Sequence, residues 1–457
     1  MPVSPTSAAT GTPSGVDRRA RRPLHRSCAR RMGTGTVLAA ALWAGAAHAG
    51  GFQLRTGSPD WSANAFAGMA AKAYDASTAW TNPAGMTRLS SSEVDLGINL
   101  VATTIQFQGQ DLIGGAPVSG SQGGNAGGLN VLPGLEAVWS ATPDLKFGLS
   151  VEEPFGERTA WSGDFVGRYQ ALVSSISDTE IGLAVAYRLT PTLSIGGGPI
   201  IDHFAARLTS AVNTGPLAAL AGDPVADLHG DSWAVGYHLG VLWEPSPNFR
   251  AGIDYRSRIG EALSGNQTVA IPALIGVVSP ATAGALSTLN QSVHADLALP
   301  DVLTLSAAWV VTPGLTALAS VQWTHWALFQ ELTVTSGGAV SSVQQFRNQD
   351  SWLVSIGVNE RPAALPRWRF QGGLGFERGP IQTADRTPRL PGLDLILLGV
   401  GATYNVTRAI AVQAAYLHEF GLADASNSYS ATPSAGTLIG SYSVSGDVAS
   451  LGVTWRF

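Results

Sequence analysis

The sequence is low in charge, has almost no cysteine and, beyond residue 49, lacks long apolar runs. Charged residues make up 13% of the 457 positions, whereas Gly occurs 54 times. A membrane helix needs ~20 consecutive, strongly apolar residues, and no segment after residue 49 supplies them. A helical membrane protein is therefore disfavoured. Low charge with abundant Gly is instead typical of strands that present lipid only at every second residue.

The first 49 residues have the order of parts that a cleavable signal peptide shows. The basic region contains Arg18, Arg19, Arg21, Arg22, Arg26, Arg30 and Arg31. An apolar run follows at 37–47, and Ala47-His48-Ala49 fits an A-x-A cleavage site. The stretch before Arg30 is longer than a leader needs, which points to an over-long start. We predict that residues 1–49 are removed as a signal peptide, with a disordered basic tail as the alternative.

Removal of this leader changes the charge and the thiol content of the chain. It takes away seven of the 27 basic residues and one of the 32 acidic residues, so the net charge falls from −5 to −11. An acidic mature chain argues against nucleic acid as a partner. The single cysteine, Cys28, leaves as well, so no disulfide or reactive thiol remains. Thiol and metal-thiolate chemistry are excluded, and we predict neither a metal nor a cofactor.

From about residue 93 onward the chain consists of segments with alternating hydrophobicity. Between Trp233 and Trp243 every second residue is apolar, and the intervening residues are small or polar except for Leu242. A period of two indicates β-strands. One face suits lipid and the other a lumen, and aromatic residues lie at the strand ends, as in the interfacial girdles of membrane barrels. Segments 249–256 and 368–377 show the same pattern.

The connections between these segments fall into two alternating classes. Short ones, often with proline, include 141–144, 190–192, 244–248 and 312–314, and each is followed by a long one. Barrels of the bacterial outer membrane have short periplasmic turns and long extracellular loops. We therefore predict an all-β fold in which residues 93–457 form a transmembrane antiparallel β-barrel of about 14 strands. The predicted strands are 93–108, 131–140, 145–154, 176–189, 193–208, 231–243, 248–262, 295–311, 315–335, 351–360, 367–378, 393–404, 409–421 and 446–457.

The last strand ends the chain on an aromatic residue. From Ala449 to Phe457 apolar residues alternate with small or polar ones. A terminal Phe on such a strand resembles the signal that the barrel assembly machinery reads. We therefore expect Phe457 to direct the protein to the bacterial outer membrane, where its partners are lipid and the assembly machinery and where we expect a monomer.

Residues 50–92, which precede the first strand, have no period of two. They are rich in Ala, Gly and Asn, with a helix-compatible piece at 63–73. Such a segment can fold inside a barrel, where lumenal side chains satisfy its backbone polar groups. We predict a hatch in the lumen. A mobile periplasmic tail is the alternative, although it would leave Trp61, Phe66 and Trp80 in water.

Several segments resemble the FadL/TodX family of outer-membrane transporters for long-chain fatty acids and hydrocarbons. The mature start Gly50-Gly51-Phe52-Gln53-Leu54, the 68–79 stretch and Asn82-Pro83-Ala84-Gly85 resemble the family's hatch. Segments 243–258 and 386–391 resemble internal motifs. The resemblance spans nearly the whole mature chain. It implies passive diffusion of a hydrophobic molecule from extracellular loops to a lumenal pocket, a shift of the hatch and lateral exit at a kinked strand.

Each step of this implied route has candidate residues. Ligand capture is expected in the long loops 211–230 and 263–295. Their apolar stretches at 216–221 and 271–278 include Leu217, Ile271 and Leu274. The alternative is that these residues only pack against each other as a loop core. A kink is expected at Pro154 and Gly156, because proline cannot donate to the ladder, unless Pro154 simply ends the strand. Phe52 and Phe155 are expected to contact the ligand. Asn82, Pro83 and Ala84 form the hatch motif, with a plain turn as the alternative.

For the pocket, the period of two places His203, Ala205 and Arg207 on one face of the fifth strand, which we take to face the lumen. Arg207 could hold a carboxylate in a bidentate pair. The resemblance implies that family members which bind fatty acids have more basic residues on this strand. This chain has Ala205 at a position where a basic residue is expected. A hydrocarbon ligand therefore becomes more plausible. Arg256 is a further lumenal candidate, although a structural salt bridge is its default role.

Two other classes of function compete with this prediction. A general or substrate-selective porin for small polar solutes would have a water-filled lumen lined by charges, whereas this lumenal face is often Gly, Ala and Ser and a plug precedes the barrel. An enzyme would need a nucleophile held beside a base, and neither G-x-S-x-G nor H-E-x-x-H occurs. We therefore predict a transporter of hydrophobic small molecules with no catalytic residues.

Overall fold

The computed structural model of the chain describes residues 51–422, 427–430 and 432–457. The chain divides into two units, Met1–Ala41 and Leu42–Phe457. The first unit and the whole predicted leader lie outside the described residues. From residue 93 onward strands predominate. None of the helices in the described ranges combines the length and apolar content that a membrane-crossing helix needs.

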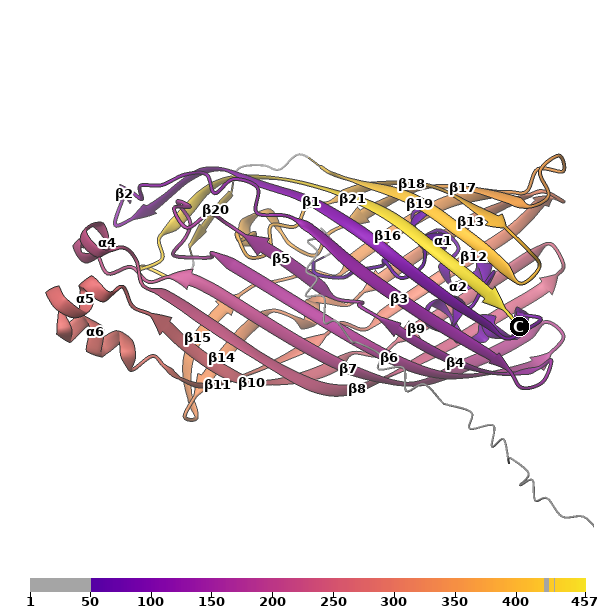
Figure 1. The fold of residues 1–457 in the computed structure, drawn as a ribbon, viewed down its shortest axis with the longest axis horizontal. Coiled ribbons are helices and arrows are strands. Elements are labelled where there is room, and N and C mark those ends of the chain that lie inside the picture. The colour runs from indigo at the N-terminus through magenta and orange to yellow at the C-terminus, as the bar shows by residue number, and fades with distance from the viewer. Residues whose placement is uncertain (1–50, 423–426, 431) are drawn as a thin grey trace, which may run out of the picture. The chain divides into compact units, whose positions relative to one another are not determined.

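In the described part of the chain, fourteen wall positions form a closed antiparallel ring (Figure 1), as predicted. The first strand pairs with the last over twenty residue pairs, from Glu93 opposite Arg456 to Leu112 opposite Thr437. The sheet therefore has no free edge. In ring order the wall consists of β1 (Glu93–Ile113), β3 (Leu129–Ser140), β4 (Leu145–Glu152), β6 (Val173–Thr190), β7 (Leu193–Ala211), β8 (Val225–Ser246), β9 (Phe249–Arg256) with β10 (Ile259–Ala270), β12 (Val302–Thr312) with β11 (Gln291–Leu299), β13 (Leu315–Thr324) with β14 (Glu331–Ser336), β16 (Ser351–Glu360) with β15 (Ala339–Gln345), β17 (Trp368–Arg378), β18 (Leu395–Asn405), β19 (Ile410–Gly421) and β21 (Thr437–Arg456).

The outward-facing side chains form an apolar band around the wall. On β21, Leu451, Val453 and Trp455 are exposed, whereas the residues between them are buried. Further along the same outer face Ser443 and Ser445 replace the apolar residues, so the band ends there. Aromatic side chains mark its other margin, as expected for amphipathic rings at the headgroup level. The exposed aromatic residues at the short-turn ends are Trp139, Tyr187, Trp243, Trp309, Trp368, Trp455 and Phe457.

Several predicted strands are wrong because the structure interrupts them. The predicted strand 248–262 breaks at Ser257 and Arg258, 295–311 breaks at Pro300 and Asp301, and 315–335 breaks where η2 (Trp326–Leu328) lies. Pro300 has no N–H for the ladder. In the opposite sense, β7 and β8 extend so far that the third loop shrinks from the predicted 211–230 to residues 212–224. Apolar patterning gave no signal for these extensions, because they lie beyond the lipid band.

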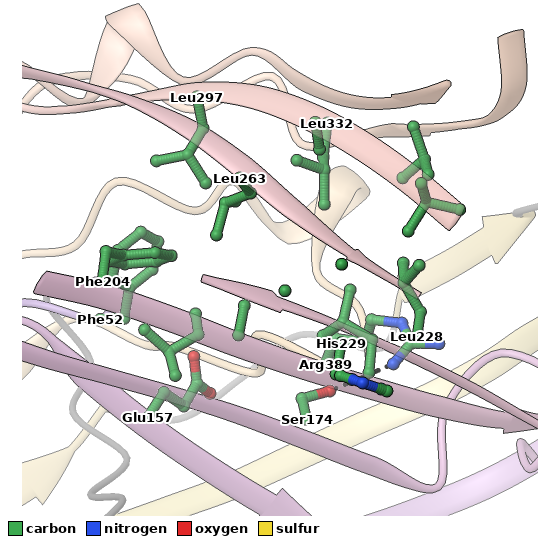
Figure 2. Close-up of a pocket in the computed structure, with 18 of the residues that line it drawn as sticks. Phe52, Glu157, Ser174, Phe204, Leu228, His229, Leu263, Leu297, Leu332 and Arg389 are labelled. Atoms are coloured by element: carbon green, nitrogen blue, oxygen red, sulfur yellow. Dashed lines mark hydrogen bonds between the residues drawn. The ribbon is translucent and has the colours of Figure 1, made fainter. Parts of the chain in front are cut away.

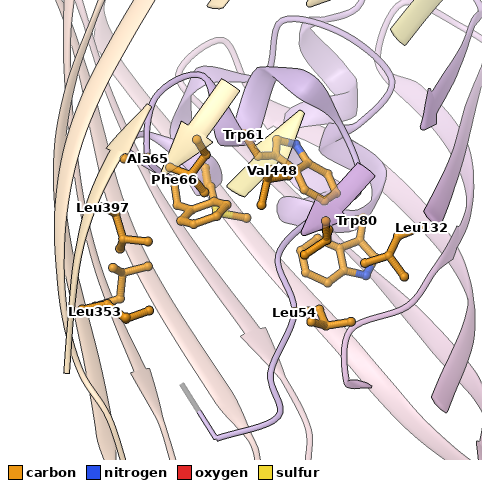
Figure 3. Close-up of a cluster of buried hydrophobic side chains, with 13 residues drawn as sticks. Leu54, Trp61, Ala65, Phe66, Trp80, Leu132, Leu353, Leu397 and Val448 are labelled. Carbon is orange, nitrogen blue, oxygen red and sulfur yellow. The ribbon is translucent and has the colours of Figure 1, made fainter. Parts of the chain in front are cut away.

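The N-terminal segment, residues 51–92, packs against inward-facing parts of the wall. It contains α1 (Pro59–Ser62), α2 (Met69–Lys72), α3 (Thr78–Thr81) and η1 (Pro83–Arg88), which contact strands on different sides of the ring. Within the helix-compatible piece 63–73 only Met69–Lys72 is helical, and Ala65 and Phe66 adopt positive φ between two short helices. Trp61 stacks on Trp80 with ring centroids 4.9 Å apart, and Figure 3 shows them with Phe66 among wall leucines.

Glycine on the wall lets this segment approach closely. A Cβ atom at Gly252 would lie 1.8 Å from the Ala70 carbonyl oxygen, and one at Gly373 would lie 2.0 Å from that of Asn64. Both distances are far below van der Waals contact, so any larger residue would displace the segment. The abundance of lumenal glycine therefore reflects space taken by the N-terminal segment.

Buried ion pairs fix this segment to the wall. Asp60 accepts from Lys72 at 2.7 Å and from Arg369 at 2.8 Å, and Gln371 donates to it at 2.7 Å. Arg55 pairs with Glu377 at 2.9 Å. Because buried charges need such partners, these lumenal charges serve to hold the segment.

Replacement of Leu451 by Arg tests the position of the lipid band. Leu451 lies near the middle of the band on β21, where an arginine costs about 2–4 kcal/mol. We expect Leu451→Arg to lower the free energy of unfolding in phospholipid vesicles by that amount, measured by urea titration. Ser443→Arg, on the same face of the same strand beyond the band, is the control and should change it by less than ~1 kcal/mol. Equal losses in the two variants would contradict this assignment.

Replacement of Asp60 tests the anchoring of the N-terminal segment. Asp60→Ala leaves Lys72 and Arg369 buried without their shared carboxylate, which typically costs about 3–5 kcal/mol. We expect that loss in the free energy of unfolding, measured in the same vesicles. Asp144→Ala removes an exposed partner of Arg188, 3.6 Å away, and should cost below ~1 kcal/mol. A loss for Asp60→Ala as small as for this control would show that the pair does not anchor the segment.

Candidate functional site

An apolar cavity, the first cavity, lies within the barrel beside the tip of the N-terminal segment. It encloses about 770 Å³ free of protein atoms, including its mouth. Most of its lining is apolar, and the polar members are Glu157, Ser174, His229, His294 and Arg389. The lining comes from inward faces of neighbouring strands, together with Phe52 and Leu390 (Figure 2). Among the lining side chains are Ile176, Phe204, Ala206, Leu228, Leu263, Leu297, Phe329 and Leu332.

Strand β7 contributes the opposite face from the one predicted. Phe204, Ala206 and Leu208 line the first cavity, so the alternate residues point outward. His203 contacts the exposed Trp233, with ring centroids 4.6 Å apart. The expectation that His203, Ala205 and Arg207 face the lumen is therefore wrong. The pattern fixed which residues share a face, but this far along the strand both faces carry small and polar residues, so the pattern did not show which one faces inward.

Arg207 has a structural partner on the outer face. Its guanidinium bonds Asp227 of β8, with the shortest contact at 2.6 Å. His203 lies 3.4 Å from Asp231. These pairs border the apolar band just beyond Trp233, and they leave Arg207 without access to a ligand in the lumen.

Arg389 reaches the first cavity, which His229 and His294 also line. It follows β17 in the connection to β18 and bonds the Ser174 hydroxyl at 3.3 Å. Burial lowers the pKa of Arg389 to about 10, while Tyr429 opposes the shift, so the guanidinium stays charged at neutral pH. Among the described residues no carboxylate forms an ion pair with it. The sequence contained it within the 386–391 motif but gave no sign of its position.

The tip of the N-terminal segment separates the first cavity from a second one. Phe52 packs edge-on against Trp326, Phe155 and Phe329, with ring centroids 4.7, 5.9 and 5.9 Å away. Phe155 lines the second cavity. The structure thus brings together Phe52 and Phe155, two predicted ligand contacts, whereas sequence reasoning missed Trp326 and Phe329, which sit at a strand break that it did not foresee.

The second cavity is smaller and more polar than the first. It encloses about 550 Å³ between the N-terminal segment and the strand breaks at Pro154, Ser257 and Pro300. Arg256 lines it but pairs with Glu180 and lies 4.5 Å from the Trp80 ring centroid. Arg256 therefore has the structural salt-bridge role that was its default in the sequence analysis.

The ladder opens at Pro154. Strand β4 pairs with both β3 and β6, whereas β5 (Gly156–Ala160) pairs with β6. Between them the chain turns inward and bonds the N-terminal tip: Leu54 N–H donates to Pro154 O at 2.7 Å, and Gly156 N–H donates to Phe52 O at 2.8 Å. Pro154 therefore interrupts the strand and does not end it at a loop.

Asn82 fixes the second half of the N-terminal segment. Its side-chain oxygen accepts from Ala84 N–H at 3.1 Å, which caps η1 beginning at Pro83, and its amide donates to the carbonyls of Ala70 at 2.7 Å and Val241 at 3.0 Å. The hatch motif thus ties two turns of the segment to β8. Its contacts explain why an asparagine is needed here.

The predicted loop residues lie apart from both cavities. Leu217 is on α4 (Pro216–Ala221), and Ile271 and Leu274 are at or on α5 (Ala273–Val278), next to α6 (Pro280–Ser287). These helices gather at the end of the barrel opposite the C-terminus (Figure 1). Leu220, Leu274 and Val277 are exposed there. A third, wider cavity of about 1570 Å³ shares Leu228, Leu332 and Arg389 with the first and forms its polar mouth.

Comparisons with known proteins agree with this architecture. The family model of the outer membrane protein transport protein (OMPP1/FadL/TodX) matches residues 40–457. A putative outer membrane protein of Neisseria meningitidis serogroup B is 25% identical over 424 residues, which cover 84% of this chain and 88% of that protein. The long-chain fatty acid transport protein of Escherichia coli (strain K12) is 24% identical over 414 residues, 84% of this chain and 91% of that protein.

Solved structures show the same fold. A FadL homologue of Pseudomonas aeruginosa superposes with a TM-score of 0.82 at 23% identity and covers 89% of this chain and 100% of its own. The toluene transporter TbuX of Ralstonia pickettii gives 0.63 at 18% identity, with 90% and 99% covered. Since the family model spans most of the sequence, the chain belongs to the OMPP1/FadL/TodX family of outer-membrane transport proteins.

Proposed function

We propose that this outer-membrane transporter admits hydrophobic small molecules by passive diffusion, with the first cavity as their binding site. The observation that carries this proposal is an apolar cavity with a polar mouth, set in a barrel whose lumen is occupied by the N-terminal segment. Apolar walls favour a ligand that leaves water. Relatives named for long-chain fatty acids and for toluene support the same class of ligand.

Arg389 makes a carboxylated ligand the favoured occupant. A guanidinium without an ion-pair partner, beside the Ser174 hydroxyl, can bind a carboxylate through charge-assisted hydrogen bonds. Most of the remaining lining offers an apolar surface to a long tail. The proposed substrate is therefore a long-chain fatty acid, with its carboxylate at Arg389 and its tail toward Phe52. A hydrocarbon would use the apolar surface alone.

The N-terminal segment acts in this proposal as the hatch. Its tip, Phe52 to Leu54, lies between the two cavities and pairs with the kink at Pro154 and Gly156. Withdrawal of the tip would join the cavities and expose the break between β3 and β5 as a lateral exit. Asn82, Pro83 and Ala84 hold the rest of the hatch in place.

A general porin fits these features less well. Its lumen would have to conduct water and small polar solutes, whereas residues 51–92 fill this lumen and are nearly all buried. Family membership also favours a dedicated transporter over a porin or an enzyme.

Deletion and reconstitution test the proposed function together. A strain that lacks the gene should take up radiolabelled oleate several-fold more slowly than its parent, and expression of the full-length protein should restore the rate. Liposomes that contain the purified protein should not swell in arabinose. Parental uptake in the deletion strain would refute the transport proposal, and rapid swelling would favour the porin.

Substitution of Arg389 tests the carboxylate anchor. Loss of hydrogen bonds to a charged group typically costs about 1.5–3 kcal/mol, so Arg389→Gln should weaken oleate binding roughly 10- to 100-fold, measured by fluorescence displacement. Toluene binding should be unchanged. Arg207→Gln, which alters a guanidinium on the outer face, is the matched control and should bind oleate like the parent. An equal loss for oleate and toluene would argue against a carboxylate anchor.

A further inference from the structure

The wall contains a second seam without a ladder, distinct from the break at Pro154. Strand β8 pairs with β9 from Trp243 to His238 and with β10 from Asp231 to Val225. Among the described residues, Ser232–Gly236 of β8 and Ile259–Leu263 of β10 have no register partners across this seam. Their other edges are fully paired, with β7 and β11. Five residues at ~3.3 Å each make the seam about 17 Å long.

The seam begins at an extra residue. His238 pairs with Arg256 and Asp231 pairs with Ser264, so seven steps along β8 face eight steps along the neighbouring strand. One surplus residue in an antiparallel pair produces a bulge, here at Ser257 and Arg258. Beyond the bulge the two strands do not resume pairing until Ser264.

Side chains hold the seam where the ladder is missing. The Ser232 hydroxyl donates to the Glu261 carboxylate across it. At its end next to the bulge, Tyr237 N–H donates to Ser257 Oγ at 2.9 Å, and Ser257 N–H donates to Tyr237 O at 2.9 Å. The Glu261 side chain is buried. The Ser232–Glu261 contact is therefore a latch between two otherwise unpaired backbones.

The seam separates the two cavities from lipid. Leu263 lines the first cavity, and Ile259 lines the second. Both side chains are buried in the aromatic cluster around Phe52. On the outer side Trp233 and Val235 are 66% and 71% exposed, and a Cβ atom at Gly260 would meet no other atom within 4 Å. One five-residue stretch of β10 thus lies between an apolar cavity and the apolar band.

We propose that this seam is a second lateral passage, through which a hydrophobic ligand moves between the first cavity and the outer-membrane lipid. Displacement of Ile259–Leu263 away from β8 breaks the Ser232–Glu261 contact and no ladder bonds between β8 and β10. Where the ladder is continuous, as between β17 and β18, the same movement would break it in a medium that offers no replacement donors. The passage rests on the proposed transport function and gives its ligand a route that does not require the N-terminal tip to leave the kink.

A reversible crosslink across the seam tests this passage. The ideal Cβ position at Gly236 lies 2.9 Å from Ser257 Oγ, which suits the short reach of a disulfide. Gly236→Cys/Ser257→Cys in the full-length protein should form this bond, confirmed by mass spectrometry; otherwise a short bifunctional thiol reagent bridges the same cysteines. We expect oleate uptake by oxidised cells to fall at least fivefold and to recover on addition of dithiothreitol.

The control crosslink joins the same strands where the ladder is intact. Val241 and Ile253 are register partners on the outer face, and Val241→Cys/Ile253→Cys should leave uptake unchanged. If the seam crosslink transports at the control rate, the passage is refuted while transport itself stands. A loss that dithiothreitol does not reverse also refutes it, because the crosslink is then not the cause. Absence of uptake in the parent would refute the transport proposal and the passage together.

Discussion

The absence of hydrogen-bonding solvent in the bilayer core is the constraint on which the rest of this structure depends. A backbone group exposed to acyl chains has no partner except another strand, so the wall must close, and β1 meets β21 over their whole shared length. Closure of the wall then determines which residues face outward, which face inward and where the N-terminal segment lies. Outward residues become apolar, inward residues are free to be small or charged, and the only place for residues 51–92 with their buried ion pairs is within the ring.

Departures from the ladder are confined to one side of the ring. Strands β17, β18, β19, β21, β1 and β3 each run without interruption, whereas the chain breaks between β4 and β5, β9 and β10, β11 and β12, β13 and β14, and β15 and β16. These breaks surround Phe52. The residues Phe155, Pro300 and Trp326 lie at the breaks. An aromatic cluster therefore compensates for the missing ladder from within. The cavities lie where the wall is least regular, because uninterrupted strands would leave no room for inward-turned segments.

The sequence predicted the features that follow from periodicity. It missed those that depend on which face of a strand points inward, on loop conformation or on strand breaks. Alternation over segments such as 233–243 gave the strand count and the closed barrel, because lipid imposes a strict period of two. The same period could not orient His203 and Arg207, since beyond the lipid band both faces of β7 tolerate polar residues. Arg389 lies in a loop, where no periodicity links its sequence position to Ser174 of β6. Of the strand breaks, the sequence predicted the one at Pro154 and missed those at Pro300 and at Ser257, where a bulge needs no special residue.

The N-terminal segment combines two kinds of attachment that differ in how easily they are released. Asp60 and Asn82 join it to the wall through buried charges and backbone carbonyls, and breaking such contacts leaves unpaired polar groups in a low dielectric. The tip from Phe52 to Leu54 is held instead by aromatic packing and by backbone bonds to Pro154 and Gly156. The hydrocarbon tail of a ligand can replace aromatic packing with its own contacts, but it cannot replace the Asp60 carboxylate between Lys72 and Arg369. In the transport that we propose, the tip is therefore the part of the segment that a hydrophobic ligand displaces, while the buried contacts of Asp60 and Asn82 hold the remainder in place.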